Sequence, residues 1–393
     1  MIKTVYILAA RRTPVGSFMG SLASVSAPKL GATAIAAALK DAGVNPKDVG
    51  QVYMGNVLSA GIGQAPARQA SIYAGIPNSV PCTTVNKVCG SGMKALMLGA
   101  QSIETGEAEV VVVGGMENMS QVPHYLENSR GGFRMGHQKI IDGMIKDGLW
   151  DPYGDVHMGN CAELCAKELG FTRQAQDEYA IQSFKRSQEA IKSGKFKNEI
   201  APVAITQKKG DPILVDTDEG PGKAQFDKMP KLSPVFQKDG TVTAANSSTI
   251  NDGAAALVLV SEEYVKRTGA KPLAKIISYA SHAQAPEWFT TAPVQASLNA
   301  LKRAGWNKGD VDLWEVNEAF AVVAMAALKE LELDNEKLNV HGSGVSLGHP
   351  IGASGARLVV TLVNALRTHG KKRGLASICI GGGEGTAVTV ELV

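Results

Sequence analysis

Short apolar runs alternate along this chain with amphipathic stretches that end at glycines. The run "VVVV" at 110–113 is far shorter than the roughly 20 residues that cross a bilayer, and it predicts a buried strand. The first residues, "MIKTVYILAARRTPVG", predict a short strand that enters a turn, because Arg11, Arg12 and Pro14 interrupt the apolar pattern. A helix is predicted from Arg173 to Lys192.

One supersecondary plan occurs twice. Segment 37–57, "AALKDAGVNPKDVGQVYMGNV", aligns without gaps with segment 299–319, "NALKRAGWNKGDVDLWEVNEA", and each predicts a helix ended by a glycine, a loop and a strand. Segments 89–117 and 348–384 each predict a Gly-rich turn, a helix, a polar loop, an apolar strand and a second glycine turn. The repeat indicates an α/β fold with two similar halves, each built on a central sheet.

The pattern loosens between the halves into stretches rich in Gly, Pro and charge, which is typical of an inserted functional loop region. We therefore expect three parts. Residues 1–117 form an N-terminal core half that is completed by about 251–270, residues 118–250 form a loop domain, and residues 271–393 form a C-terminal core half.

The charge is nearly balanced, with 40 Lys and Arg against 37 Asp and Glu, which argues against wholesale binding of nucleic acid or of an anionic membrane. Any anionic partner is expected to be small. Five cysteines without a secretory leader predict free thiols in a reducing compartment rather than a disulfide framework. No transit peptide precedes the first strand, and the final "ELV" is not a peroxisomal address, so we expect a cytoplasmic protein.

Four motifs carry candidate chemistry. Cys89 in "NKVCGSGMKAL" precedes a helix, where free N–H groups stabilise a thiolate, and His349 in "SLGHPIGASGAR" lies in a loop that enters another helix. Cys379 ends an apolar strand before three glycines in "SICIGGGEG", and Asn317 follows a strand in "WEVNEAF". Taken singly, each residue also has a plain structural interpretation, as a packed thiol, a loop histidine or a turn asparagine.

The repeat adds weight to the chemical interpretation, because it places Cys89 and His349 at corresponding turns of the two halves, where their loops should converge. Two other classes of site are disfavoured. Cys161 and Cys165 lie four residues apart on a predicted helix without a second ligand pair, so we expect no metal site. The "GGGEG" segment is followed by another predicted strand rather than a helix, which excludes a dinucleotide fingerprint.

Together "NKVCGSGMKA", "WEVNEAF", "SLGHPIGASGAR" and "CIGGG" resemble the thiolase family over essentially the whole chain. The resemblance implies the thiolase fold, with two βαβαβαββ halves in α-β-α-β-α layers and an inserted loop domain. "TAANSSTINDGAAALVL" at 243–259 and "DVHMGNCAE" at 155–163 resemble the short-chain acetoacetyl-CoA thiolases more than the degradative long-chain ones.

For the chemistry, the resemblance implies an acetyl-CoA C-acetyltransferase that condenses two acetyl-CoA molecules reversibly to acetoacetyl-CoA and CoA. Cys89 would carry the acetyl group, His349 would assist its deprotonation, and Cys379 would deprotonate the second acetyl-CoA. His349 and a water held by Asn317 would stabilise the thioester enolate, and the N–H groups of Cys89 and Gly381 would stabilise the tetrahedral intermediate.

The resemblance also implies coenzyme A thioesters as substrates, no permanently bound cofactor, no nucleic-acid or membrane partner, and a homotetramer. His157 and Met158 would border a pocket for a short acyl group. The implied contacts with coenzyme A comprise Lys223, Lys228, Ala244, Ser248, Ala319 and Phe320. For any single lysine, a solvated charged face remains an equal alternative.

One departure concerns potassium. Potassium-activated mitochondrial relatives have a tyrosine where this chain has Phe184, and a small apolar residue where it has Ser247, so we expect no potassium requirement. Two other functions stay open: a broader 3-ketoacyl-CoA thiolase of fatty-acid degradation, and a non-catalytic acyl-CoA binding protein. The second is disfavoured because Cys89, His349 and Cys379 are all present. A condensing enzyme of the ketoacyl-synthase type is disfavoured by the second cysteine.

Overall fold

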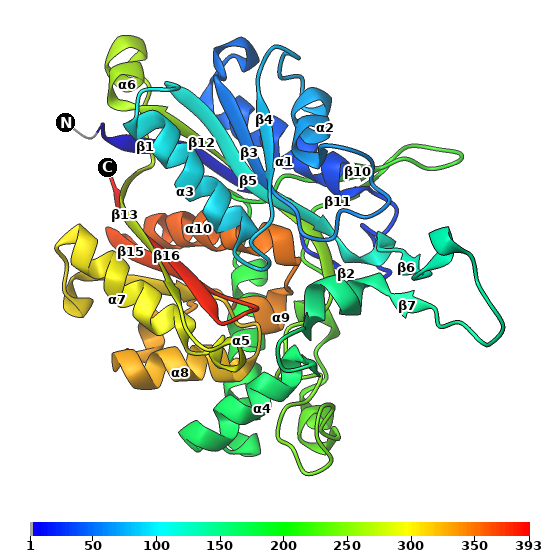
Figure 1. The fold of residues 1–393 in the computed structure, drawn as a ribbon. Coiled ribbons are helices and arrows are strands. Elements are labelled where there is room, and N and C mark those ends of the chain that lie inside the picture. The colour runs from blue at the N-terminus through cyan, green and yellow to red at the C-terminus, as the bar shows by residue number, and fades with distance from the viewer. Residues whose placement is uncertain (1–2) are drawn as a thin grey trace.

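The computed structural model describes residues 3–393 (Figure 1). The first half contains strands β1 (Val5–Arg12), β3 (Gln51–Gly55), β4 (Cys82–Val85), β5 (Val110–Asn118) and β12 (Asn251–Ser261), with helices α1 (Ala27–Ala42), α2 (Pro66–Tyr73), α3 (Ser91–Glu104) and α6 (Glu262–Thr268). Its strand order is β4-β3-β5-β12-β1, and a short β2 (Gly16–Ser17) pairs with β12. In this sheet β3 runs parallel to β4 and β5, whereas β12 runs antiparallel to β5 and β1.

The second half repeats this plan with strands β13 (Ala274–Ala283), β14 (Leu313–Val316), β15 (Arg373–Ile380) and β16 (Glu384–Leu392). Its helices are α7 (Ala292–Ala304), α8 (Ala321–Leu331), α9 (Gly344–Leu347) and α10 (Ile351–Thr368). The order β13-β16-β15-β14 mirrors the first half, and a parallel bridge between Trp314 and Leu338 takes the place of β4. The two sheets are joined where β1 and β13 pair antiparallel.

The repeat predicted from the sequence is confirmed at its helix ends. Helix α1 ends at Gly43 with φ of 63°, and α7 ends at Gly305 with φ of 68°, which is the left-handed conformation that glycine adopts most readily. The strand predicted at 110–113 is buried along its whole length as part of β5, and the helix predicted from Arg173 to Lys192 has those bounds.

Helices α3 and α10 lie between the two sheets, and the other helices cover the outer faces, which gives the expected layered arrangement (Figure 1). Glycines bring the two central helices into backbone contact. A Cβ atom added at Gly355 would lie 2.4 Å from the N atom of Met93, and one at Gly92 would lie 2.8 Å from the N atom of Ala356. Since both helices begin on the same side of this crossing, the residues that precede them are brought together.

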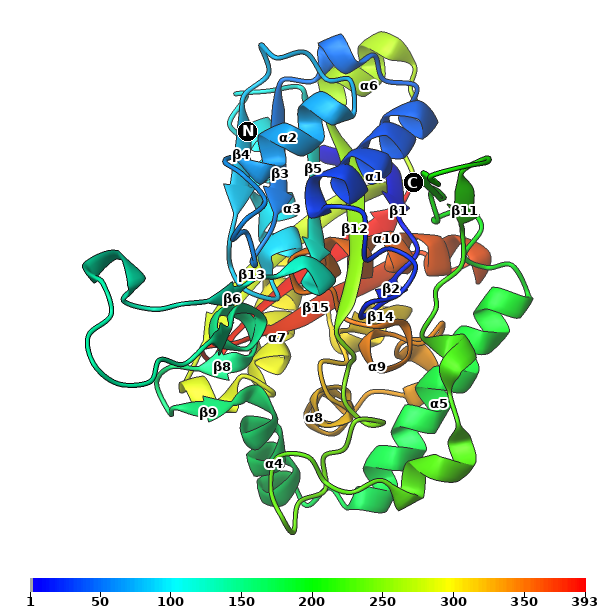
Figure 2. The same cartoon turned by 90° about the vertical axis from the view of Figure 1, so that its right-hand side faces the viewer.

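Residues 119–250 connect β5 to β12 and contain α4 (Met158–Leu169), α5 (Arg173–Lys192) and six short strands. These strands are β6 (His124–Tyr125), β7 (Ile141–Asp142), β8 (Trp150–Asp151), β9 (Val156–His157), β10 (Val203–Ile205) and β11 (Ile213–Val215). The arm that carries β6 and β7 extends away from the rest of the molecule (Figure 2).

The buried Arg12 of β1 anchors this connecting region. Its guanidinium donates to Glu199 Oε1 at 2.6 Å and to both carboxylate oxygens of Asp218 at 2.7 and 2.9 Å. Substituting one partner of such a buried ion pair strongly destabilises the fold, because the other charge is left buried without a partner. No helix among residues 3–393 combines the length and apolar character needed to cross a membrane.

Candidate active site

Cys89 lies in a strained turn between β4 and α3. The preceding residue, Val88, has φ of 43°, which a β-branched side chain rarely adopts and which marks local strain. Ser91 holds the turn in place, since its Oγ accepts the N–H of Lys87 at 2.8 Å and donates to the carbonyl of Val88 at 2.6 Å. The half-buried Cys89 thereby faces a cavity that is lined by residues from both halves of the chain.

The Cys89 thiol is not a resting thiolate. Burial raises its pKa to about 11, against the opposing effect of the N–H groups of Gly381 and of Cys89 itself, and the nearby Glu117 carboxylate raises it further. The stabilised thiolate expected at a helix N-terminus is therefore wrong, because desolvation outweighs the effect of the helix end on the pKa of Cys89.

The glycine turn after β15 packs directly against the Cys89 turn. A Cβ atom added at Gly90 would lie 2.4 Å from Ile380 Cδ1, and one at Gly381 would lie 3.2 Å from the sulfur of Met158. Lys87 and Glu384 form an ion pair across the two turns. These contacts fix the Gly381 N–H relative to Cys89.

His349 lies in the turn before α10, as the repeat predicted. Its backbone N–H donates to Asn251 Oδ1 at 3.0 Å, and Gly348, with φ of 106°, leaves no room for a side chain beside that amide. The ring Nδ1 lies 2.6 Å from the Oγ of Ser354, which also donates to the carbonyl of Pro350 at 2.9 Å. In this arrangement Nδ1 donates to Oγ, and Nε2 is the acceptor nitrogen of the ring.

Burial, with a smaller contribution from Arg357, lowers the pKa of His349 to about 3. The imidazole is therefore neutral at physiological pH. A neutral imidazole next to a neutral thiol suits a general base that takes the thiol proton during the reaction rather than before it.

Asn317 and Cys379 lie behind His349. The Nδ2 of Asn317 is 3.4 Å from the Nε2 of His349, and the Asn317 side chain lowers the pKa of the Cys379 thiol against the larger effect of burial. The Oδ1 of Asn317 is buried and accepts no hydrogen bond from residues 3–393. Burial raises the pKa of Cys379 well above its ordinary value, and the second cause is the charge of Cys89, so the two sulfurs are close enough to interact.

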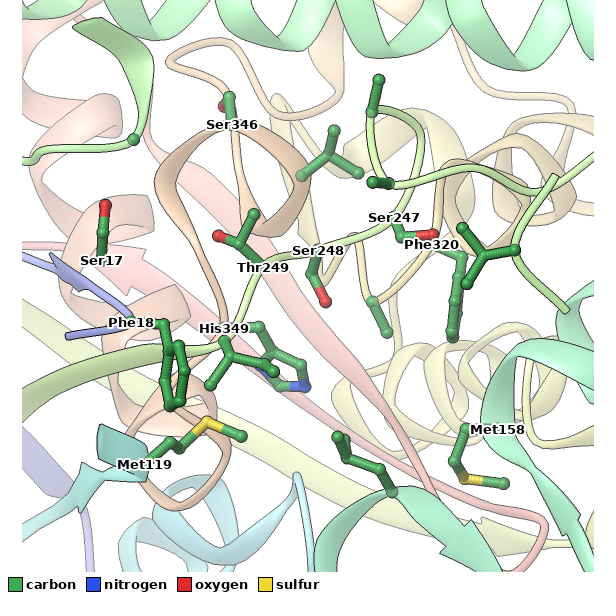
Figure 3. A pocket seen from close by; sticks show the side chains of 18 of the residues that line it. Ser17, Phe18, Met119, Met158, Ser247, Ser248, Thr249, Phe320, Ser346 and His349 are labelled. Atoms are coloured by element: carbon green, nitrogen blue, oxygen red, sulfur yellow. The ribbon is translucent and has the colours of Figure 1, made fainter. Parts of the chain in front are cut away.

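The cavity has a volume of about 790 Å³ and is lined by Cys89, His349 and Gly381. Figure 3 shows His349 in this lining, with Met158, Ser248 and Phe320. Cys379 and Asn317 are buried and do not belong to its lining. All the other predicted contact residues do line it, namely His157, Met158, Lys223, Lys228, Ala244, Ser248, Ala319 and Phe320. Sequence positions more than 200 residues apart thus meet at one cavity.

Aromatic rings form one wall of the cavity. His157 caps α4 by accepting the N–H of Gly159 on Nδ1 at 3.1 Å, and its ring stacks on Phe236 at a centroid distance of 4.7 Å. Burial lowers the pKa of His157, so it is a neutral wall residue. Phe320 contacts both Phe236 and Phe289 edge to face, at centroid distances of 6.1 and 6.3 Å.

The polar end of the cavity carries two lysines. Lys223 donates to the Oγ of Ser17 at 2.8 Å and lies 3.7 Å from a carboxylate oxygen of Glu219, and its side chain is 62% exposed. Lys228 also lines the cavity. The backbone N–H of Ser248 donates to the carbonyl of Ala319 at 2.9 Å, which joins two of the predicted contact segments.

Phe184 and Ser247, the two positions at which this chain departs from potassium-activated relatives, both line the cavity. Phe184 belongs to a buried cluster with Ala180, Met229 and Val345. The hydroxyl of Ser247 donates to the carbonyl of Thr243 at 2.7 Å. Among residues 3–393, no three His, Cys, Asp or Glu side chains gather as they would around a metal ion, and Cys161 and Cys165 lie in the apolar core.

The sequence patterns did not indicate Ser354, Asn251 or Glu117. These residues form hydrogen bonds with His349 or with the first turn of α10. Ser354 could have been found, because it follows His349 by about one helical turn in "GHPIGASGAR". Asn251 and Glu117 carry no local signal. They reach the site only because the start of β12 and the end of β5 lie side by side next to it.

The chain belongs to the thiolase family. The model for the thiolase N-terminal domain matches residues 5–263, and that for the thiolase C-terminal domain matches residues 270–392. Acetyl-CoA acetyltransferase 2 of Arabidopsis thaliana is 54% identical over 393 residues, covering 100% of this chain and 98% of that protein. Acetyl-CoA acetyltransferase of Cupriavidus necator is 54% identical over 388 residues, covering 98% and 99%.

A solved structure shows the same fold. The thiolase of Ascaris suum, crystallised in complex with coenzyme A, superposes with a TM-score of 0.95 at 45% identity and covers 100% of both chains. The expected thiolase fold is therefore confirmed. The family assignment made from the four motifs is confirmed as well.

Proposed function

We propose that this protein is an acetyl-CoA C-acetyltransferase that interconverts two acetyl-CoA molecules with acetoacetyl-CoA and CoA through an acetyl-Cys89 intermediate. The observation that carries the proposal is the meeting of Cys89, His349 and Gly381 at one cavity, with Cys379 behind it. The names of the full-length relatives support the choice of acetyl-CoA as substrate.

In the first half-reaction, the Cys89 sulfur attacks the thioester carbonyl of acetyl-CoA while its proton passes to Nε2 of His349. The tetrahedral oxyanion accepts hydrogen bonds from the N–H groups of Cys89 and Gly381, the two backbone groups that also lower the pKa of the Cys89 thiol. The C–S bond to coenzyme A then breaks, and the leaving thiolate takes the proton from His349. The products are acetyl-Cys89 and free CoA.

In the second half-reaction, Cys379 acts as the base. It first gives up its thiol proton to solvent, and the resulting thiolate removes a proton from the methyl group of a second acetyl-CoA. The enolate oxygen is stabilised by His349 and by a water held at the buried Oδ1 of Asn317, an acceptor that no other described residue uses. The carbanion attacks the acetyl-Cys89 carbonyl, and the proton on Cys379 returns to the Cys89 sulfur as it leaves. Sharing one preorganised site between the steps avoids a three-body encounter.

The cavity supports binding of an extended coenzyme A thioester. Its aromatic and Met158 wall suits an apolar acyl group, and Lys223 and Lys228 suit the anionic nucleotide end. We propose that residues 118–250 act as the loop domain between core halves 1–117, completed by about 251–270, and 271–393. Most of the proposed coenzyme A contacts belong to that loop domain.

Mass spectrometry after brief exposure to acetyl-CoA tests the proposal. We expect one acetyl group per chain, mapped to Cys89, with release of an equal amount of CoA. Acetylation at another residue, or none in a folded protein, would contradict it.

A broader 3-ketoacyl-CoA thiolase of fatty-acid degradation is the second candidate. Phe320 contacts Phe236 and Phe289 edge to face, and all three rings line the cavity. This packed cluster favours the short-chain function, because it gives way less readily to a long acyl chain. Rates of thiolysis with ketoacyl-CoA substrates of increasing length separate the two. Efficient cleavage of long chains would favour the degradative enzyme and would mean that these rings leave room for a long acyl chain.

The assembly and compartment are further parts of the proposal. The exposed Phe133, Met135 and Ile140 on the β6–β7 arm support a homotetramer, since apolar side chains on a protruding arm favour contact with another copy. Five free thiols support a reducing, cytoplasmic setting. We propose no resident cofactor, no metal, no potassium requirement, and no nucleic-acid or membrane partner. Light scattering of the purified protein tests the oligomer.

A further inference from the structure

Glu117 is a fully buried carboxylate at the end of β5, directly beneath the candidate active site. One oxygen accepts the side-chain N–H of Asn56 at 2.8 Å and the backbone N–H of Leu58 at 3.1 Å. The other accepts the backbone N–H of Val57 at 3.1 Å and that of Gly352 at 2.8 Å. Both oxygens are thus saturated by donors from two distant segments.

These donors belong to the elements that carry the reacting groups. Gly352 is the second residue of α10, three residues after His349. Asn56 follows β3, and its own N–H donates at 3.1 Å to the carbonyl of Val85, which ends the strand before the Cys89 turn. A carboxylate at a helix N-terminus is also favoured by the helix dipole. Glu117 therefore ties the His349 helix to the segment beside Cys89.

The backbone segments around this carboxylate are closely packed. A Cβ atom added at Gly352 would lie 2.6 Å from a Glu117 oxygen, and one at Gly115 would lie 2.0 Å from the carbonyl of Gly352. One added at Gly55 would lie 2.6 Å from the N atom of Gly92 in α3. The backbones of β3, β5, α3 and α10 meet here without intervening side chains, so a change at Glu117 is transmitted to both helices.

The carboxylate also acts on Cys89 through its charge. Glu117 raises the pKa of the Cys89 thiol, whereas burial raises the pKa of Glu117 itself to about 7. The charged group that faces Glu117 from β12 is Asp252, which raises its pKa as well, while β3 and α10 contribute neutral donors. Cys379 on β15 is the other titratable group that interacts with Cys89.

We propose that Glu117 is a positioning residue of the acyl-transfer site. It holds the helix that follows His349 in place relative to the Cys89 turn, and its negative charge opposes formation of the Cys89 thiolate. The proposal rests on the proposed function, because it assigns Glu117 a part in forming acetyl-Cys89. It predicts that Glu117→Gln speeds alkylation of Cys89 but slows its acetylation. A substitution that only loosened the fold would not have opposite effects on these two reactions.

The test compares Glu117→Gln with the parent in two assays. The first measures alkylation of Cys89 by iodoacetamide from pH 6 to 10, with the labelled residue identified by mass spectrometry. Removal of the charge should speed alkylation by about three- to tenfold above pH 7, where Glu117 is ionised in the parent, and should leave it unchanged at pH 6. The second measures acetylation by acetyl-CoA, which should become at least about tenfold slower. Gln has one acceptor oxygen where Glu has two, so either Gly352 and Val57 or Asn56 and Leu58 lose the acceptor of their N–H groups.

Two further variants act as controls. Glu117→Asp keeps the charge but shortens the side chain, so acetylation should slow while the pH dependence of alkylation stays that of the parent. Glu163→Gln alters another buried carboxylate, which accepts the backbone N–H groups of Thr241 and Val242 at 2.8 Å, and should leave the pH dependence of alkylation unchanged.

The proposal is overturned if Glu117→Gln alkylates and acetylates like the parent, or if Glu163→Gln and Glu117→Asp change the alkylation profile as Glu117→Gln does. Alkylation needs no acyl-CoA, so it reports on Glu117 separately. If the parent itself is never acetylated, the proposed function fails, whereas an altered alkylation profile in Glu117→Gln would still support the electrostatic action on Cys89.

Discussion

The Nδ1 atom of His349 lies 2.6 Å from the Oγ atom of Ser354, on the first turns of α10. With the hydroxyl proton directed at the carbonyl of Pro350, Nδ1 carries the imidazole proton and Nε2 accepts. If the hydroxyl turns to donate to Nδ1, the ring proton belongs on Nε2. One serine can therefore support His349 as a proton acceptor in the first half-reaction and as a donor to an enolate in the second.

Ser354→Ala should slow both half-reactions by about 10- to 100-fold, because His349 loses the group that fixes its tautomer and ring orientation. The rate of Cys89 acetylation and the rate of acetoacetyl-CoA thiolysis measure the effect. Thr361→Ala is the matched control, since it removes another buried hydroxyl of α10, one that donates to Glu199 at 3.1 Å. Equal losses in the two variants would mean that Ser354 only stabilises the helix.

Cys379→Ser should separate the half-reactions. Acetylation of Cys89 should continue, because it needs only His349 and the two N–H donors, whereas condensation should be lost by about 100-fold or more since a serine hydroxyl is a far weaker base. Mass spectrometry follows the acetyl group, and an enzymatic assay follows acetoacetyl-CoA. Cys89→Ser is the companion variant and should lose both steps. A folded Cys379→Ser protein that cannot be acetylated would contradict the division of roles.

Potassium should have no effect on activity. Cations of this kind need several oxygen ligands, and the wall at Phe184 is built from apolar side chains such as Val345 and Met229. Rates in potassium chloride and sodium chloride at equal ionic strength should agree. Several-fold activation by potassium would show that backbone oxygens alone build a site there.

The part of the site that could be predicted from the sequence is the part that follows from local turns and from the repeat. Cys89 and His349 each precede a central helix, and once the two halves pack with α3 against α10, both residues must lie near one crossing. The positions of Gly381 and Asn317 follow from the ends of β15 and β14 in the same way.

The electrostatic state of the site could not be predicted, because it depends on burial by segments far away in the sequence. The helix N-terminus before Ser91 suggested a thiolate, yet the thiol of Cys89 is neutral since desolvation dominates its pKa. Glu117 was missed for a related reason. In the sequence it only ends an apolar strand, and its four donors come from the loop after β3 and from α10.

A histidine pair outside the candidate active site, His341 and His369, predicts how the stability of the fold responds to acid. His341 is buried, its ring meets Phe196 edge to face at 5.7 Å, and its Nε2 lies 3.1 Å from that of His369. Burial, followed by the charges of His369, Lys195 and Arg12, lowers its pKa to about 3.

An unfolded histidine titrates near 6.5, so neutral His341 contributes stability that is fully present above about pH 6.5 and is lost as the pH falls toward 3. The slope for one proton is about 1.4 kcal/mol per pH unit. His341→Gln removes this titration. Between pH 6 and 4, the free energy of unfolding of the variant should therefore decrease less per pH unit than that of the parent, by about 1.4 kcal/mol.

Urea unfolding at several pH values measures the two slopes. Glu117, whose pKa is raised to about 7, acts in the opposite direction, because protonation favours the folded state as the pH falls from 7 to about 4.5. It is present in both proteins and cancels in the difference, as does His349. The exposed His137→Gln control should follow the parent. Parallel curves for His341→Gln and the parent would mean that His341 is protonated in the folded protein together with its partner, and the predicted acid sensitivity would be wrong.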